Sequence, residues 1–96
     1  MTHSTEKVNR IYELPNVGDR RKSFYGKAHV IENESGKIFL QSYNTIVCYI
    51  NKDGEFVKTW DWYSSTTMRH INSFLRFFNL PGGGKSWWDK LETKEF

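Results

Sequence analysis

The hydrophobic pattern of this chain changes its period once, between residues 60 and 67, and this change limits the folds it can adopt. Before it, apolar residues alternate with polar ones over several short stretches, as in β-strands. After it, Met68, Ile71, Leu75 and Phe78 recur at steps of three, four and three residues, as on one face of an amphipathic helix. Strands followed by helices, rather than alternating with them, predict an α+β fold.

The strand region divides at turn sequences. Strand character runs from Phe24 to Ile31, from Lys37 to Ile50 and from Glu55 to Trp60. The Asp53-Gly54 pair predicts a tight hairpin turn. The middle stretch either bends as one strand or turns at Tyr43-Asn44, and we favour two strands because Asn tolerates left-handed backbone geometry. We therefore expect an antiparallel meander of three or four strands. Its buried face is marked by residues of one parity: Ile38, Leu40, Ile46, Cys48 and Ile50.

The helical region predicts one amphipathic helix and one short C-terminal helix. Hydroxyl side chains at residues 64–67 can cap a helix that runs from Thr67 to Asn79 and packs across the sheet. The sequence at residues 79–82 ends it. Ser86 followed three residues later by Asp89 predicts a second capped start, with Trp87 or Trp88 holding the last helix against the core.

The 96 residues leave room for one domain. We expect residues 21–96 to form it and residues 1–20, which are polar and interrupted by Pro15, to be poorly ordered or loosely packed. No apolar run approaches the roughly 20 residues of a membrane helix. Cys48 is the single cysteine, so one chain forms no internal disulfide and no thiolate metal cluster. A reducing cytoplasm is the expected location.

The net charge of +3 comes from the first third of the chain, where residues 1–30 carry six basic and three acidic side chains. The excess is concentrated at Arg20, Arg21 and Lys22, next to Phe24 and Tyr25. Such a cluster can bind a phosphate backbone or an acidic protein surface. The alternative is a solvated entry to the first strand that discourages pairing at a sheet edge.

The stretch Gly82-Gly83-Gly84-Lys85-Ser86 resembles the end of a phosphate-binding loop. Such a loop has its first glycine five residues before the final one, and that position is Asn79. A helix rather than a buried strand also precedes it. We therefore interpret the glycines as a joint between two helices and expect no nucleotide cofactor.

No other set of residues assembles a catalytic or metal site. The histidines at positions 3, 29 and 70 lack the spacing of metal ligands. Cys48 could pair with His29 or His70 as nucleophile and base, but its apolar neighbours indicate a core thiol. We expect no metal, no cofactor and no enzymatic activity.

Three stretches taken together resemble a family of small uncharacterised proteins encoded by phages and prophages of Gram-positive bacteria. They are residues 22–28 (KSFYGKA), residues 42–47 (SYNTIV) and residues 66–71 (TTMRHI) followed by Phe74-Leu75. The resemblance covers about residues 22–91 and carries no known catalytic residues. It implies that recurrent polar positions are site candidates. These are Tyr43, Thr45, Thr67, Arg69 and His70.

Two functions compete under this resemblance. The first is a non-enzymatic phage accessory protein that binds a host protein in the bacterial cytoplasm, namely a defence-system component, as an anti-CRISPR-like inhibitor does. Small size, abundant aromatic residues and the lack of a catalytic set favour it. The alternative is a nucleic-acid-binding protein that uses Arg20, Arg21, Lys22 and stacked aromatic rings. A structural role in the virion is a third interpretation, and an exposed strand edge would allow a homodimer.

Overall fold

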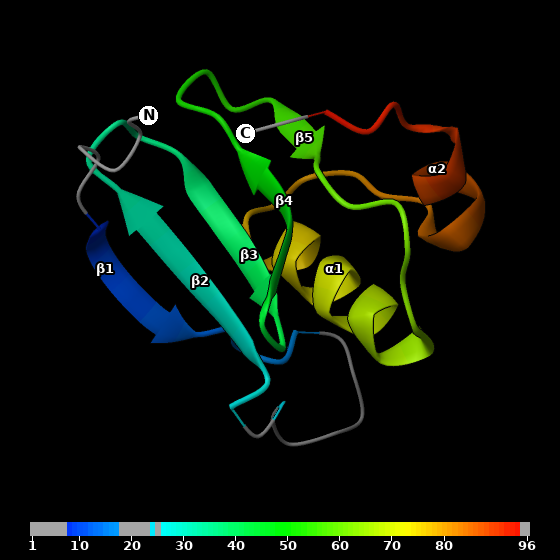
Figure 1. Ribbon diagram of the computed structural model, residues 1–96, viewed down its shortest axis with the longest axis horizontal. Coiled ribbons are helices and arrows are strands. Elements are labelled where there is room, and N and C mark those ends of the chain that lie inside the picture. The colour runs from blue at the N-terminus through cyan, green and yellow to red at the C-terminus, as the bar shows by residue number, and fades with distance from the viewer. Residues whose placement is uncertain (1–7, 18–23, 25, 95–96) are drawn as a thin grey trace.

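A computed structural model describes residues 8–17, 24 and 26–94. It contains five strands and two helices (Figure 1). In chain order they are β1 (Val8–Glu13), β2 (Ala28–Asn33), β3 (Ile38–Ser42), β4 (Thr45–Ile50), β5 (Phe56–Lys58), α1 (Ser65–Phe77) and α2 (Gly84–Lys90). The strands form one antiparallel sheet in the order β1-β2-β3-β4-β5. The predicted α+β meander is confirmed, with one strand more than expected.

The additional strand is β1, which lies inside the segment predicted to be loosely packed. It pairs with β2 from Val8↔Asn33 to Glu13↔His29. Five of its six residues are exposed, so it lacks the apolar alternation by which strands are recognised in sequence. Leu14, directly after it, is buried in the core. Residues 1–7 and 18–20 of the predicted N-terminal region, and the basic cluster of Arg20, Arg21 and Lys22, lie outside the described part.

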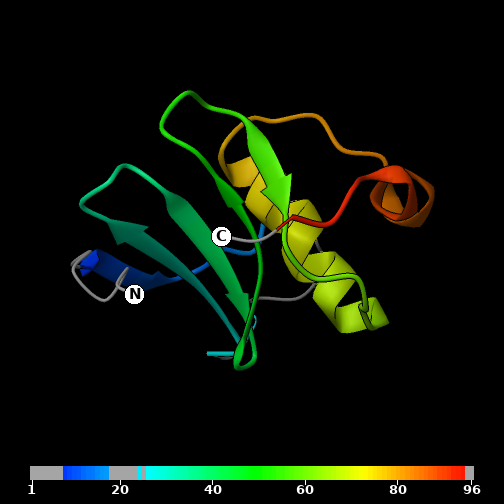
Figure 2. The same cartoon turned by 45° about the horizontal axis from the view of Figure 1, so that its top comes forward.

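The core fills the space between α1 and one face of the sheet (Figure 2). Register places Tyr12, Val30, Leu40, Cys48 and Lys58 in one row across all five strands on this face. The apolar stripe of α1 covers it, as its spacing predicts. The buried residues that α1 contributes are Thr67, Met68, His70, Ile71, Ser73, Phe74 and Leu75.

The β3–β4 connection is a two-residue hairpin, as favoured from the sequence. The left-handed residue is Tyr43 (φ 56°), whereas Asn44 was expected to adopt this conformation. The register shifts by one residue between Leu40 and Gln41. Because a bulge places two consecutive residues opposite one, Val47 and Cys48 are both buried, whereas Ile46, which was expected on the buried face, is only half-buried.

Strand β2 begins at Ala28, four residues later than predicted. Gly26 has a left-handed φ of 75°, and the Lys27 amide donates to the Phe24 carbonyl over 3.0 Å. This turn occupies the start of the expected strand. Strand β5 is likewise shorter than the predicted Glu55–Trp60.

Helix α1 begins and ends with recognised capping motifs. The Ser64 hydroxyl accepts a hydrogen bond from the Thr67 amide. At the other end, the Leu80 amide donates to the Leu75 carbonyl over 2.8 Å and the Asn79 amide to the Arg76 carbonyl over 3.1 Å. With Asn79 at φ 58°, this is a Schellman motif, so the predicted end of the helix is confirmed.

Helix α2 starts at Gly84, two residues before the predicted start at Ser86. Its N-cap is Gly83, and no side chain caps it, so the capping role predicted for Ser86 is wrong. A Cβ atom on Gly83 would lie 2.6 Å from the Trp87 Cβ, which requires glycine there. Trp88 is completely buried, so the predicted anchoring of this helix by tryptophan is confirmed. Among the described residues, neither helix is long and apolar enough to cross a membrane.

Candidate functional site

Two of the predicted site residues, Thr67 and His70, meet in a buried polar cluster with Ser42. The Ser42 Oγ lies 2.8 Å from His70 Nδ1 and 3.1 Å from Thr67 Oγ1. Ser42 ends β3, whereas Thr67 and His70 lie one turn apart on the inner face of α1. The cluster therefore ties the first turns of the helix to the β3–β4 hairpin.

The His70 imidazole is held in an environment that favours its neutral form. Burial, together with the nearby positive charge of Lys27, lowers the pKa of His70 from 6.5 to about 4. Its Nδ1 has Ser42 as partner, but its Nε2 is buried without a hydrogen bond. Protonation would place a charge where no described group accepts a hydrogen bond from Nε2.

A serine and a histidine at this distance are also the geometry of a nucleophile and its base. Ser42 is only 2% exposed and His70 is 0% exposed, so a substrate does not reach either atom in this conformation. Cys48 is equally buried, and burial raises the pKa of its thiol, which disfavours the reactive thiolate. The predicted core role of Cys48 is confirmed.

Tyr43 covers the polar cluster from the hairpin tip. Its ring centre lies 5.7 Å from that of His70, and the Phe24 ring packs edge-on to the same imidazole at 4.6 Å. Tyr43 is 45% exposed, so it is the one member of the group that reaches the surface.

The other predicted site residues that the structure describes do not join this cluster. Arg69 points to the exposed side of α1, and Thr45 is half-buried at the start of β4. Arg20, Arg21, Lys22 and Tyr25 lie outside the described residues. Among the described candidates, Thr67 and His70 thus lie in the buried cluster and Tyr43 covers it, whereas Arg69 and Thr45 lie apart from it.

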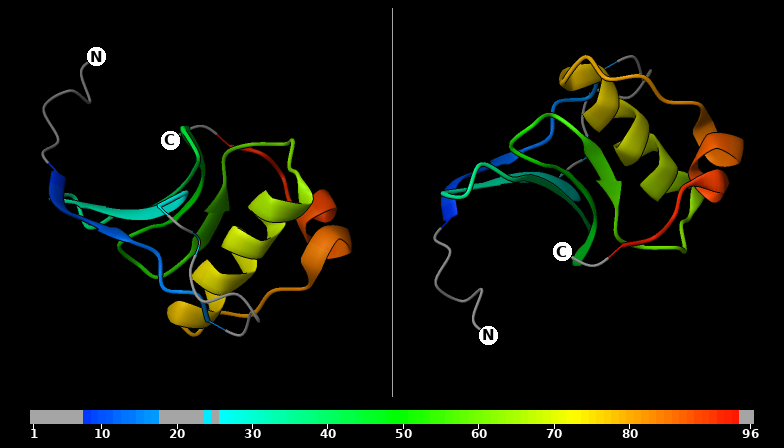
Figure 3. Two further views of the ribbon diagram at one scale, coloured as in Figure 1. Left: turned by 90° about the horizontal axis from the view of Figure 1, so that it is seen from below. Right: turned by 90° about the horizontal axis from the view of Figure 1, so that it is seen from above.

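A second row of apolar side chains lies on the sheet face opposite the helices. Both views in Figure 3 show α1 and α2 on one side of the sheet. On the other side, register aligns one residue from each strand in a continuous row: Ile11, Ile31, Phe39, Tyr49 and Val57. All five are apolar or aromatic. We call this set the cross-sheet row.

The cross-sheet row has a graded exposure. Ile11 at the edge is 58% exposed, Ile31, Phe39 and Val57 are half-buried, and Tyr49 is 9% exposed. The Phe39 and Tyr49 rings pack at 5.4 Å, and the Lys37 ammonium lies 5.3 Å from the Tyr49 ring centre. The sequence analysis missed the row because it used the alternation only to identify one buried face. The residues of the opposite face are aligned by the register between strands, which exists only in the assembled sheet.

Comparison with known proteins gives one match. A family described as being of unknown function (DUF8033) matches residues 12–90. This chain belongs to that family. No curated protein and no solved structure matches it.

The DUF8033 match begins inside β1 and ends at the last residue of α2. It therefore spans the buried polar cluster and four of the five residues of the cross-sheet row. The family description names no source, so the resemblance to phage and prophage proteins stays a prediction.

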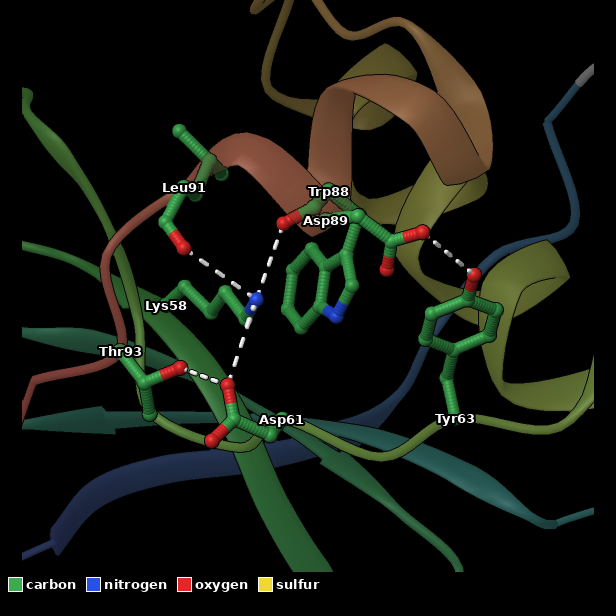
Figure 4. A network of polar contacts seen from close by, with 7 residues as sticks. All are labelled: Lys58, Asp61, Tyr63, Trp88, Asp89, Leu91 and Thr93. Carbon is green, nitrogen blue, oxygen red and sulfur yellow. Dashed lines mark hydrogen bonds and ion pairs between the residues drawn. The ribbon is translucent and has the colours of Figure 1, made fainter.

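In this member of DUF8033, a buried lysine on β5 organises the C-terminal region (Figure 4). Lys58 is 4% exposed, and its ammonium donates to the Trp88 carbonyl at 2.9 Å and the Leu91 carbonyl at 3.3 Å. It also lies 3.5 Å from the Asp61 carboxylate, which accepts a hydrogen bond from Thr93. A cation at the last carbonyls of a helix is favourable, so Lys58 fixes α2 against the sheet. No signal in the sequence distinguishes this lysine from an exposed one.

The glycine run lines a pocket of about 290 Å³ beside α1, together with Asn72 and Arg76. The Arg76 guanidinium donates to the Val17 carbonyl over 3.2 Å. A Cβ atom on Gly82 would lie 2.6 Å from the Leu75 side chain. Close packing of the connecting loop on α1 thus disfavours a side chain at this position, in keeping with the predicted joint. Among the described residues, no group of three or more His, Cys, Asp or Glu side chains could hold a metal ion.

Proposed function

We propose that this protein is a small non-enzymatic binding module that docks a protein partner on the helix-free face of its sheet. The observation that carries the proposal is the cross-sheet row, which places an apolar residue of every strand on a face that neither helix covers. Soluble proteins rarely leave a contiguous apolar surface without a use.

The composition of this surface fits a protein partner. Aromatic and branched side chains supply the centre, and His29, Lys37 and Gln41 supply polar groups around it. An apolar centre with a polar rim is the usual anatomy of a protein interface. The Ser42–His70 pair supports the non-enzymatic part of the proposal because both side chains are closed off from solvent.

The narrower proposal is that the partner is a component of a bacterial defence system, bound in the host cytoplasm. It rests on the resemblance to phage-encoded proteins. The nucleic-acid alternative rests on Arg20, Arg21 and Lys22, and it predicts binding that weakens steeply with salt.

Affinity capture from cells that naturally contain the protein tests the proposal. The native chain should recover a stoichiometric protein, and Ile31→Lys, which places a charge in the middle of the row, should lose it. Trp62→Lys is the matched control, because Trp62 is 68% exposed in the connection between β5 and α1. Recovery of nucleic acid alone, or equal recovery of the protein by Ile31→Lys, would contradict the proposal.

A further inference from the structure

The two edges of the sheet differ in how they are protected. At β5, Thr93 forms a parallel bridge with Lys58, and the Lys94 amide donates to the Lys58 carbonyl over 2.8 Å. At the opposite edge, β1 is twice as long as β5, and no segment among the described residues pairs with its outer side (Figure 1). Unprotected edges are templates for pairing with another strand.

The direction of the backbone groups of β1 follows from one hydrogen bond. The Leu14 amide donates to the Ala28 carbonyl over 2.9 Å, so the amide and carbonyl of Leu14 face β2. Because these groups alternate along an antiparallel strand, those of Tyr12 also face β2. The amides and carbonyls of Ile11 and Glu13 therefore face away from the sheet.

The charged side chains of β1 do not protect this edge, because both are engaged within the chain. Arg10 pairs with Glu32 of β2 at 2.9 Å and stacks over the Tyr12 ring at 4.4 Å. The Glu13 carboxylate accepts a hydrogen bond from the Gly26 amide over 2.9 Å. Ile11 stays at the centre of the strand with 58% of its surface exposed.

We propose that β1 pairs antiparallel with β1 of a second copy of this chain, so that two five-stranded sheets join into one. A two-fold axis perpendicular to the sheet generates such a pair and keeps the helices of both copies on the same side. Three registers match the outward-facing backbone groups of Ile11 and Glu13. They set Ile11 opposite Ile11 of the second copy, Ile11 opposite Glu13, or Glu13 opposite Glu13.

The register centred on Ile11 is the one that the side chains favour. It buries two exposed isoleucines against each other, places Arg10 opposite the Tyr12 ring and sets no like charges opposite. It also joins the two cross-sheet rows end to end. The exposure of Ile11, which exceeds that of the other row residues, then follows from its missing neighbour strand.

Sedimentation velocity of the full chain between about 5 and about 500 μM tests this proposal, because micromolar self-association changes the dimer fraction over that range. The native chain should pass from monomer to dimer. Ile11→Pro should weaken the dimer at least about tenfold. Its missing amide is one that faces away from β2, so the intrachain ladder is kept. Ile11→Lys is a second variant that leaves the backbone unchanged and should weaken the dimer as well.

Trp62→Lys, which alters another exposed apolar residue, should dimerise like the native chain. A native chain that stays monomeric over the whole range overturns the proposal. So does a dimer that survives both Ile11 substitutions in variants whose circular dichroism is native. Binding of a different protein through Ile31 is a separate result and decides nothing about the β1 edge.

Discussion

At the scale of single residues, His70 is a buried titratable group that the fold holds in its neutral form. The sequence marked Thr67 and His70 as site candidates but could not pair them with Ser42, because that contact joins residues 28 positions apart. The sequence signal at Ser42 is that a polar residue shares the parity of the core-facing residues Ile38 and Leu40. A buried hydroxyl needs a hydrogen-bond partner, so this position predicts a buried polar contact.

The neutral state of His70 makes stability depend on pH. The folded protein holds this imidazole at a pKa of about 4, whereas the unfolded chain has the ordinary value of 6.5. Between these values the unfolded state binds more protons, so stability is lost as the pH falls through this window. We expect a loss of about 2 kcal/mol between pH 7 and pH 5.

Urea unfolding at both pH values measures this loss. His70→Gln keeps a polar side chain of similar length but cannot titrate, so its stability should change much less over the same interval. An equal loss in the native chain and in this variant would show that His70 is not the group responsible.

At the scale of elements, the sequence was reliable where a pattern is local and regular. The spacing of Met68, Ile71, Leu75 and Phe78 identified α1, and the Asp53-Gly54 turn separated β4 from β5. The sequence was unreliable where a contact between distant residues determines whether an element forms or where it begins. Strand β1 forms because β2 supplies its hydrogen bonds, and α2 starts at Gly84, next to a glycine N-cap on which Trp87 packs.

Helix α2 is the clearest case of an element held by one distant side chain, that of Lys58. Lys58→Met keeps the apolar stem but removes the ammonium from the carbonyls of Trp88 and Leu91. Hydrogen bonds from a charged group contribute about 1.5–3 kcal/mol, so α2 should detach more readily by that amount.

Hydrogen exchange with mass spectrometry measures the effect. Amides of residues 84–91 should exchange faster in Lys58→Met, while those of α1 keep their protection. Lys85→Met is the matched control because Lys85 is exposed on the same helix. Unchanged exchange at residues 84–91 in Lys58→Met would mean that Trp88 packing alone holds the helix.

At the scale of the whole molecule, the sheet separates two kinds of surface. One face packs against α1 and forms the core. The other presents the cross-sheet row, and its exposed end at Ile11 lies on the unprotected edge. The row could not be predicted from the sequence because it needs five strands in a fixed register, and one of these strands, β1, has no recognisable sequence pattern. Ile31 lies within the face alone, whereas Ile11 belongs both to the face and to the edge.

Site-specific photo-crosslinking in cells tests the central claim most directly, namely that the helix-free face receives a protein. A benzophenone side chain replaces Ile31 in the cross-sheet row or, as a control, Ser86 on exposed α2. We predict one abundant protein adduct from position 31 and none of that mass from position 86. Adducts from position 86 alone, or adducts only to nucleic acid, would contradict the account.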